Sequence, residues 1–372
     1  MKSIGVLDSA RGLAVLLVLA HHVGLLFPAP TLAAPLNWIW YKAWVNGDQG
    51  VSLFFVLSGF LITRLLAGSP HGLFAPDFRD FYARRAGRIL PLLAWVCLLG
   101  LGLAAWAPTG PSLAGVFFAT PPAPSAAAFW ASLGTFWFNW FRVFTHQPVG
   151  FHWGVLWSLS VEEQFYLFYP LALSWLQTRR KLAAFLLLFA ALGPASQWVG
   201  LSFPAGHSVV RFNSFNGFSL IALGALLFLV WEKGQGALRA NPRAAWLWTL
   251  GGIFLMGKVY FRQPYFADYW GSRLDDFLIG LGFCFFLMGA LTLDFFELPV
   301  WAGLRWIGKM SYGIYLYQGL VLFLLFPCLA GRGPYLDFAL ALAAVSVLGW
   351  VSLRLLEQPA NRWIRRRLSG SA

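Results

Sequence analysis

Two adjacent histidines, His21 and His22, lie in the middle of the first apolar stretch of the chain. An ionisable side chain at that depth in a membrane helix is costly unless it is paired or hydrated, so it marks a candidate functional site. A neutral imidazole there could act as a general base. Arg11 precedes His22 by 11 residues, about three helical turns, so the two side chains lie on nearly the same helix face. The alternative for His22 is a structural bond to a backbone carbonyl.

Two adjacent carboxylates, Glu162 and Glu163, lie in another apolar and aromatic stretch. Neighbouring residues of a helix point about 100° apart, so the two cannot face one partner. Counted from Trp153, Glu162 lies about 14 Å deep, and His22 reaches a similar depth from the opposite side of a core about 30 Å thick. We therefore predict that Glu162 orients His22 as a base. The alternative is a carboxylate that only joins helices.

Three arginines, Arg84, Arg85 and Arg88, lie just before Pro91, at the inner end of a third apolar stretch. Arg85 and Arg88 are three residues apart, so they share one helix face. Guanidinium groups bind phosphate oxygens in a bidentate manner, and this pair predicts a site for an anionic, phosphate-bearing ligand from the cytoplasm. The alternative is that the arginines only mark the cytoplasmic side of the membrane.

The elements that position these residues follow from composition. Of the 372 residues, 59% are hydrophobic and only 11% are charged, whereas a soluble domain has about 25% charged residues. This excludes a soluble fold and predicts an all-α integral membrane protein. Apolar windows of about 20 residues indicate a bundle of about ten transmembrane helices. The windows are 11–28, 50–67, 89–106, 153–176, 182–199, 213–231, 244–260, 273–292, 311–329 and 335–355.

Two shorter features complete this organisation. The stretch 129–141 is too short to span a membrane comfortably and is predicted to be re-entrant or interfacial. The window 50–67 contains Ser58 and Gly59, small residues that allow helices to approach closely.

The net charge of +13 is interpreted through topology rather than nucleic-acid binding. With ten spans and a cytoplasmic N-terminus, most of the 27 lysines and arginines fall in the inside segments. We therefore expect both termini to be cytoplasmic, membrane lipids around the bundle, and no nucleic-acid partner. No long linker divides the chain, so residues 1–372 are predicted to form a single domain. No cysteine pair has metal-type spacing, and no metal site is expected.

Taken together, the motifs resemble those of the membrane-bound acyltransferase-3 family, O-acyltransferases that modify bacterial surface glycans. The matching pieces are Arg11 to His22, Gly50 to Thr63, the Arg85 and Arg88 pair, Trp157 to Tyr166, Gly308 to Leu316, and Glu357-Gln358-Pro359, with a weaker element at Arg211 to Gly224. The resemblance implies that His22 is the catalytic base, that Arg11 is also required, and that Glu162 belongs to the active site. It implies that the arginine segment with Arg84, Arg85 and Arg88 contacts acyl-coenzyme A. The chain departs from the family pattern at Ser52, where Asp is common, and at Gln318, where His is common.

The residues and the resemblance together predict a membrane O-acyltransferase of the plasma membrane. Its donor would be cytoplasmic acyl-CoA, with acetyl-CoA favoured, and its acceptor a hydroxyl of a glycan or a lipid-linked sugar. One alternative is a proton-coupled transporter, because buried His and Glu also suit a proton relay. The other is a non-catalytic membrane scaffold of the same fold, motivated by Ser52 and Gln318.

Overall fold

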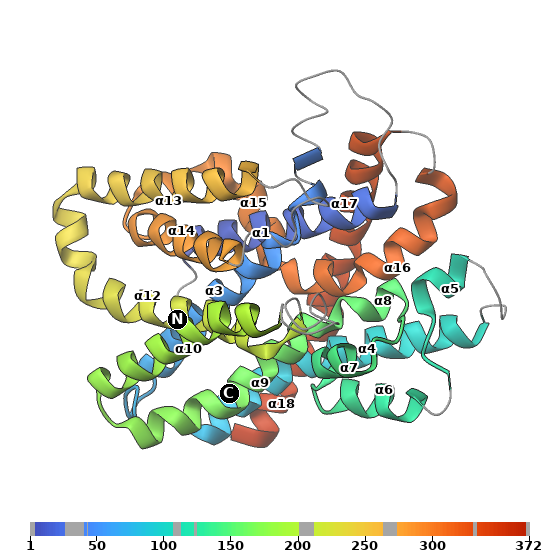
Figure 1. Cartoon of the computed structure of the whole chain (residues 1–372), viewed down its shortest axis with the longest axis horizontal. Helices are drawn as coiled ribbons and strands as arrows, with labels where there is room; N and C mark the ends of the chain where they lie inside the picture. The colour runs from blue at the N-terminus through green and yellow to red at the C-terminus, as the bar shows by residue number, and fades with distance from the viewer. Residues whose placement is uncertain are drawn as a thin grey trace.

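The computed structural model describes residues 4–26, 41–42, 44–106, 113–122, 125–200, 212–262, 274–329 and 333–369. Across these ranges the chain is helical and contains no strand, which confirms the all-α fold class. Helices α12, α13 and α14 lie on one side of the bundle and α16 and α17 on the other, with α1 and α3 between them (Figure 1).

Eight helical segments among the described residues are long and apolar enough to cross a membrane. They are α1 (Gly5–Leu26), α3 (Gln49–Ala67), α4 (Phe78–Trp106), α10 (Arg179–Gly200), α12 (Ser214–Ala240), α13 (Pro242–Arg262), α16 (Ser311–Leu329), and α17 (Pro334–Ser352) with the turns after it. The other two predicted spans are also helical, α9 (Leu156–Leu176) and α14 (Asp275–Ala290). Helix α14 has only 16 residues, and α9 carries Glu162 and Glu163, so the predicted number of ten is approximate.

The surface of the outer helices supports a membrane environment. Leu98 on α4 and Leu247 and Phe254 on α13 are more than 60% exposed. Many other large apolar side chains of α4, α10 and α13 are exposed as well, far more than a soluble monomer shows to water. Apolar groups on the outside and polar groups inside are what a bilayer solvent requires.

Short helices connect the long ones. The stretch predicted not to span the membrane forms α6 (Ser125–Gly134) and α7 (Phe138–Thr145), separated by a turn in which Phe136 has a φ of 59°. Neither helix is long enough to cross a hydrocarbon core of about 30 Å. The remaining short elements are α5 (Leu113–Phe118), α8 (Phe151–Gly154), η1 (Asp294–Glu297), η2 (Pro299–Trp301), α15 (Ala302–Lys309), the π-helical turn η3 (Leu353–Glu357) and α18 (Gln358–Ser369).

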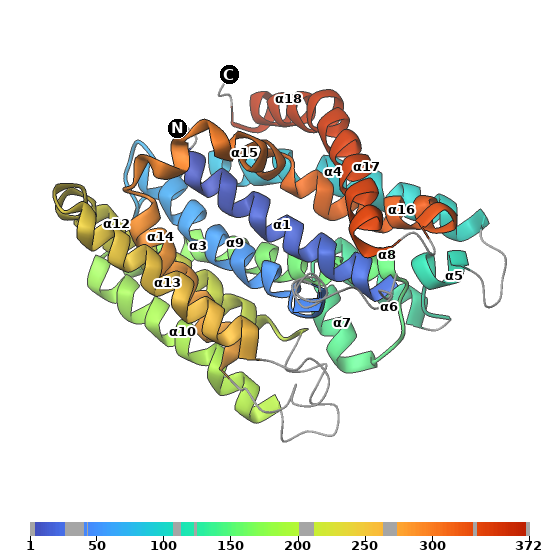
Figure 2. The same ribbon diagram turned by 90° about the horizontal axis from the view of Figure 1, so that it is seen from above.

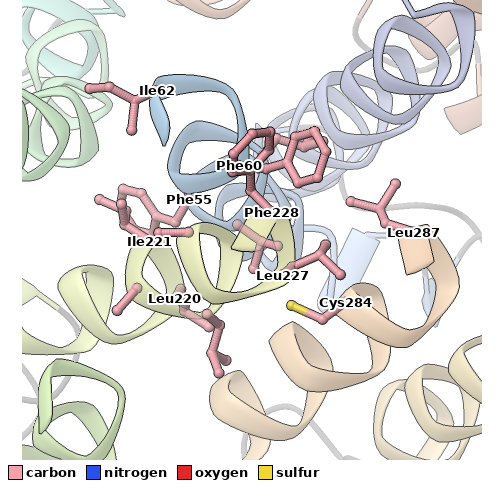
Figure 3. Close-up of a cluster of buried hydrophobic side chains, with 14 of the residues drawn as sticks. Phe55, Phe60, Ile62, Leu220, Ile221, Leu227, Phe228, Cys284 and Leu287 are labelled. Carbon is pink, nitrogen blue, oxygen red and sulfur yellow. The ribbon is translucent and has the colours of Figure 1, made fainter. Parts of the chain in front are cut away.

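Helices α3 and α12 cross closely because each has a glycine at the contact. A Cβ atom at Gly59 would collide with the backbone carbonyl of Ile221, and one at Gly224 would collide with that of Val56. The prediction that Gly59 permits close helix packing is therefore confirmed. Around this crossing, side chains of α3, α12 and α14 form an apolar core (Figure 3).

Helix α4 begins at Phe78, 11 residues before the predicted start of its span at 89, so the predicted arginine cluster lies in the first three turns of a continuous helix. Figure 2 shows that α18, α15 and the start of α1 lie at the same end of the bundle. Helix α18 packs along α4, and α15 packs against α1. This end of the bundle therefore carries the arginines of α4 and α18.

Candidate active site

A cavity of about 380 Å³ opens between α1, α3, α4, α9, α16 and α18. Its charged lining residues are Arg11, Arg64, Arg84, Arg85, Arg88, Glu162 and Arg365. Five of the six predicted site residues, all but His22, therefore lie around one space. With six guanidinium groups and one carboxylate in its wall, the cavity favours a ligand that carries several negative charges.

The arginines differ in whether a nearby carboxylate already neutralises their positive charge. Arg84 forms an ion pair with Asp80 at 2.6 Å, and Arg11 approaches Asp8 at 3.4 Å. Arg85 stacks over the ring of Tyr166 at 4.7 Å, and its Nε is buried without a hydrogen-bond partner among the described residues. Arg85 and Arg88 form no ion pair in the part of the chain that the structure describes. They are therefore better placed to receive an anion than Arg84 and Arg11 are.

Glu162 lies among these arginines. The hydroxyl of Tyr166 donates to Glu162 Oε2 at 3.4 Å, and Tyr166 also forms a short hydrogen bond with Ser58. Arg85, Arg88 and Arg11 are all near enough to interact electrostatically with this carboxylate. Glu163 does not line the cavity, in agreement with the prediction that adjacent carboxylates face different partners.

His22 lies outside the lining of this cavity and contacts α16. Its Nδ1 lies 2.8 Å from Oε1 of Gln318, and its ring packs edge-on against Phe151. Gln318 is fully buried, and its Nε2 donates to the carbonyl of Tyr315 at 2.9 Å. Because that bond turns the amide oxygen toward the imidazole, Nδ1 of His22 must be the protonated nitrogen. Nε2 of His22 then keeps its lone pair, as a general base requires.

The predicted pairing of Glu162 with His22 is wrong. No hydrogen bond joins these two described residues, and Nδ1 of the imidazole bonds Gln318 instead. The depth argument placed both groups at a similar level of the bilayer, but depth does not determine which helices are neighbours. The sequence offered one signal for the true partner, since Gln318 is a position where the chain departs from the resembled pattern.

The histidine and the cavity are nevertheless connected through α16. Tyr315 lines the cavity and bonds Ser158, which is also in the lining, at 2.7 Å. Gln318 follows Tyr315 by three residues, about 4.5 Å along the helix axis. Gln318, which bonds the candidate base, therefore lies about one helical turn beyond the lining residue Tyr315.

Among the charged and amide side chains that line the cavity, three were not predicted as site residues: Arg64, Asn361 and Arg365. Arg64 lies near the end of the 50–67 window, and the other two follow the last apolar window. Ser52 is the other position at which the chain departs from the family pattern. Its hydroxyl donates to Gln49 Oε1 at 3.1 Å, and Gln49 Nε2 donates to Asp276 Oδ1 at 2.7 Å. The carboxylate of Asp276 is therefore connected to Ser52 through two hydrogen bonds, with Gln49 between them. Among the described residues, no group of three or more His, Cys, Asp or Glu side chains is arranged to hold a metal ion.

Comparison with known proteins assigns this chain to a family. Residues 4–355 match the acyltransferase-3 family, described as an acyltransferase domain, and the chain belongs to this family. The resemblance stated from the motifs is thus confirmed. No solved structure matches the chain significantly.

Three bacterial relatives are similar over nearly the whole chain. YrhL of Bacillus subtilis, provisionally named a peptidoglycan O-acetyltransferase, is 28% identical over 95% of this chain and 54% of its own length. Peptidoglycan O-acetyltransferase OatA of Listeria monocytogenes is 26% identical over 97% of this chain and 56% of its own length. O-acetyltransferase OatA of Staphylococcus aureus is 25% identical over 96% and 57%. The chain thus spans about half the length of the curated relatives it matches.

Proposed function

We propose that this protein is a membrane O-acyltransferase that transfers an acyl group, favouring acetyl, from acyl-CoA to a hydroxyl of a glycan or lipid-linked sugar. The observation that carries the proposal is an arginine-lined cavity whose lining residue Tyr315 lies about one helical turn from Gln318, the residue that bonds Nδ1 of His22. The cavity suits a phosphate-bearing donor, which a proton-coupled transporter does not need. The names of the relatives favour O-acetyl transfer and a glycan acceptor.

The donor would enter from the cytoplasmic side, at the end of the bundle where α18 and the start of α1 lie (Figure 2). Arg85 and Arg88, with Arg84 beside them, would hold its phosphates by charge-assisted hydrogen bonds. Binding energy far from the thioester would then orient the reacting group. In this proposal both termini are cytoplasmic, the protein acts in the plasma membrane, and residues 1–372 form one domain.

In the proposed reaction, Nε2 of His22 removes the proton of the acceptor hydroxyl, which enters from the outer side. The hydroxyl oxygen attacks the thioester carbonyl, a C–O bond forms, and the C–S bond breaks to release the coenzyme A thiolate, which then takes up a proton. Gln318 holds the imidazole in the required tautomer. Arg11 would position the donor or stabilise developing negative charge. Glu162 would set the positions of the surrounding guanidinium groups, a role that replaces direct contact with His22.

The direct test uses purified protein in lipid nanodiscs with acetyl-CoA and a peptidoglycan-derived muropeptide. Free thiol and acetylated sugar should appear in equal amounts, measured by a thiol reagent and by mass spectrometry. Protein that neither binds acetyl-CoA nor releases thiol with any hydroxyl acceptor would contradict the proposal. Thiol release without sugar acetylation would limit the error to the choice of acceptor.

A further inference from the structure

A second cavity, of about 290 Å³, lies between α4, α6 and α9 and is called the apolar cavity here. Its described lining residues include no charged side chain, and most of them are hydrocarbons, such as Leu93 of α4 and Leu133 of α6. The hydroxyl of Ser160, which is also in the lining, donates to the carbonyl of Leu156 at 3.3 Å. The apolar cavity therefore offers few partners to water or to a polar ligand, and it suits a hydrocarbon chain.

The apolar cavity borders the arginine-lined cavity at Leu159 of α9. Among the described residues, Leu159 is the only one that lines both cavities, and it is 7% exposed. The two linings are also adjacent on α4, where Ile89 belongs to the arginine-lined cavity and Leu90 to the apolar cavity. The side chain of Leu159 is therefore the part of the wall whose size can decide whether the two spaces communicate.

Leu159 lies at the end of the arginine-lined cavity where the reacting group is expected. Glu162 lies among the arginines, and Ser158 and Leu159 lie about one turn nearer the start of α9. Ser158 bonds Tyr315, which precedes by about one turn the α16 residue that bonds His22. A donor whose phosphates are held by the arginines would therefore present its thioester and acyl group beside Leu159.

We propose that Leu159 determines the length of the acyl group that the protein transfers. Its side chain closes the apolar cavity off from the arginine-lined cavity, so that an acetyl group fits against it and a longer acyl chain does not. This inference rests on the proposed function, because it takes the ligand of the arginine-lined cavity to be an acyl thioester. The bonds that form and break are those of the proposed reaction, and only the length of the transferred chain is at issue.

The test compares acetyl-CoA, butanoyl-CoA and hexanoyl-CoA as donors for the full-length protein in nanodiscs, with the muropeptide acceptor. Thiol release is measured at equal donor concentrations and normalised to the folded fraction. The wild type should use hexanoyl-CoA about a hundredfold more slowly than acetyl-CoA, because methylene groups that do not fit a pocket lower the rate by such factors. Leu159→Ala should raise the ratio of the hexanoyl rate to the acetyl rate at least about tenfold, because it joins the two cavities.

Leu133→Ala is the matched control. It removes the same atoms from a residue that lines the apolar cavity but not the arginine-lined cavity. The apolar cavity becomes larger while Leu159 still closes it off, so the ratio of the hexanoyl rate to the acetyl rate should stay at the wild-type value.

Each outcome decides the inference. Wild-type protein that uses hexanoyl-CoA as fast as acetyl-CoA overturns it while the proposed function stands, and so does a Leu159→Ala variant with the wild-type ratio or a Leu133→Ala variant with the same shift. Wild-type protein that releases thiol from none of the three donors overturns the proposed function and the inference together. If Leu159→Ala does not fold, Leu159→Val removes less of the side chain and should raise the ratio of the butanoyl rate to the acetyl rate about tenfold; an unchanged ratio overturns the inference.

Discussion

Alanine substitutions at His21 and His22 should separate stability from activity, although the two residues are adjacent. His21 is 2% exposed, and its Nδ1 lies 2.7 Å from the carbonyl of Trp44. His22 is only partly buried and bonds Gln318 instead. One histidine therefore joins α1 to Trp44, and the other, which bonds Gln318, is the residue proposed to act as the base.

The structure predicts different effects of the two substitutions on the free energy of unfolding and on the reaction rate. His21→Ala removes a buried ring and leaves the Trp44 carbonyl without this partner, so we expect a loss of about 2–4 kcal/mol in the free energy of unfolding. Its rate per folded molecule should stay within about threefold of the wild type, because His21 does not take part in the reaction. His22→Ala should lose about 1–3 kcal/mol of stability, because it leaves the buried Oε1 of Gln318 without its donor. Its rate should fall about a hundredfold to ten-thousandfold, the typical contribution of a general base.

The assay combines thermal unfolding in nanodiscs with thiol release from acetyl-CoA, normalised to the folded fraction. Acetyl-CoA affinity is measured in parallel and should be nearly unchanged in His22→Ala, because a general base contributes little to ground-state binding. Equal loss of rate per folded molecule in both variants would refute the reasoning and indicate that both histidines act through helix packing rather than base catalysis. Normal turnover by His22→Ala would remove His22 from the mechanism.

Three further substitutions test other parts of the argument. Arg88→Lys keeps the positive charge but loses the bidentate guanidinium group, so the dissociation constant of acetyl-CoA, measured by calorimetry, should rise about tenfold. If the variant binds acetyl-CoA as tightly as the wild type does, Arg88 is only a topology marker. Gln318→Leu should lower kcat about tenfold with little change in donor KM, since the imidazole loses the bond that selects its tautomer; an unchanged kcat would exclude that role. Gly224→Ala should destabilise the protein by about 1–3 kcal/mol, because the new Cβ meets the Val56 carbonyl, whereas Gly251→Ala, which faces open space, should leave the unfolding midpoint unchanged or raised. Similar midpoints for the two glycine variants would contradict the close crossing of α3 and α12.

Features that depend on neighbours along one helix could be predicted from the sequence. Arg84, Arg85 and Arg88 line one cavity because residues three or four apart on a helix share a face, whatever the rest of the bundle does. The helical membrane fold follows likewise from composition and the length of the apolar windows. Those windows predicted helices but placed the start of α4 too late, because the charged first turns of that helix lie outside the apolar window.

Contacts between helices were decided by the tertiary structure alone. His22 meets Gln318 rather than Glu162 because the packing of α1 against α16 sets its neighbour, and hydropathy carries no information on lateral position. Close crossings enabled by single glycines, such as Gly59 against α12 and Gly87 against α18, determine which helix faces meet. For the same reason Asn361 and Arg365, which follow the last apolar window, joined the arginine site only when α18 packed along α4. Sequence alone identified most of the candidate chemical groups, and packing between helices determined which of them can act together.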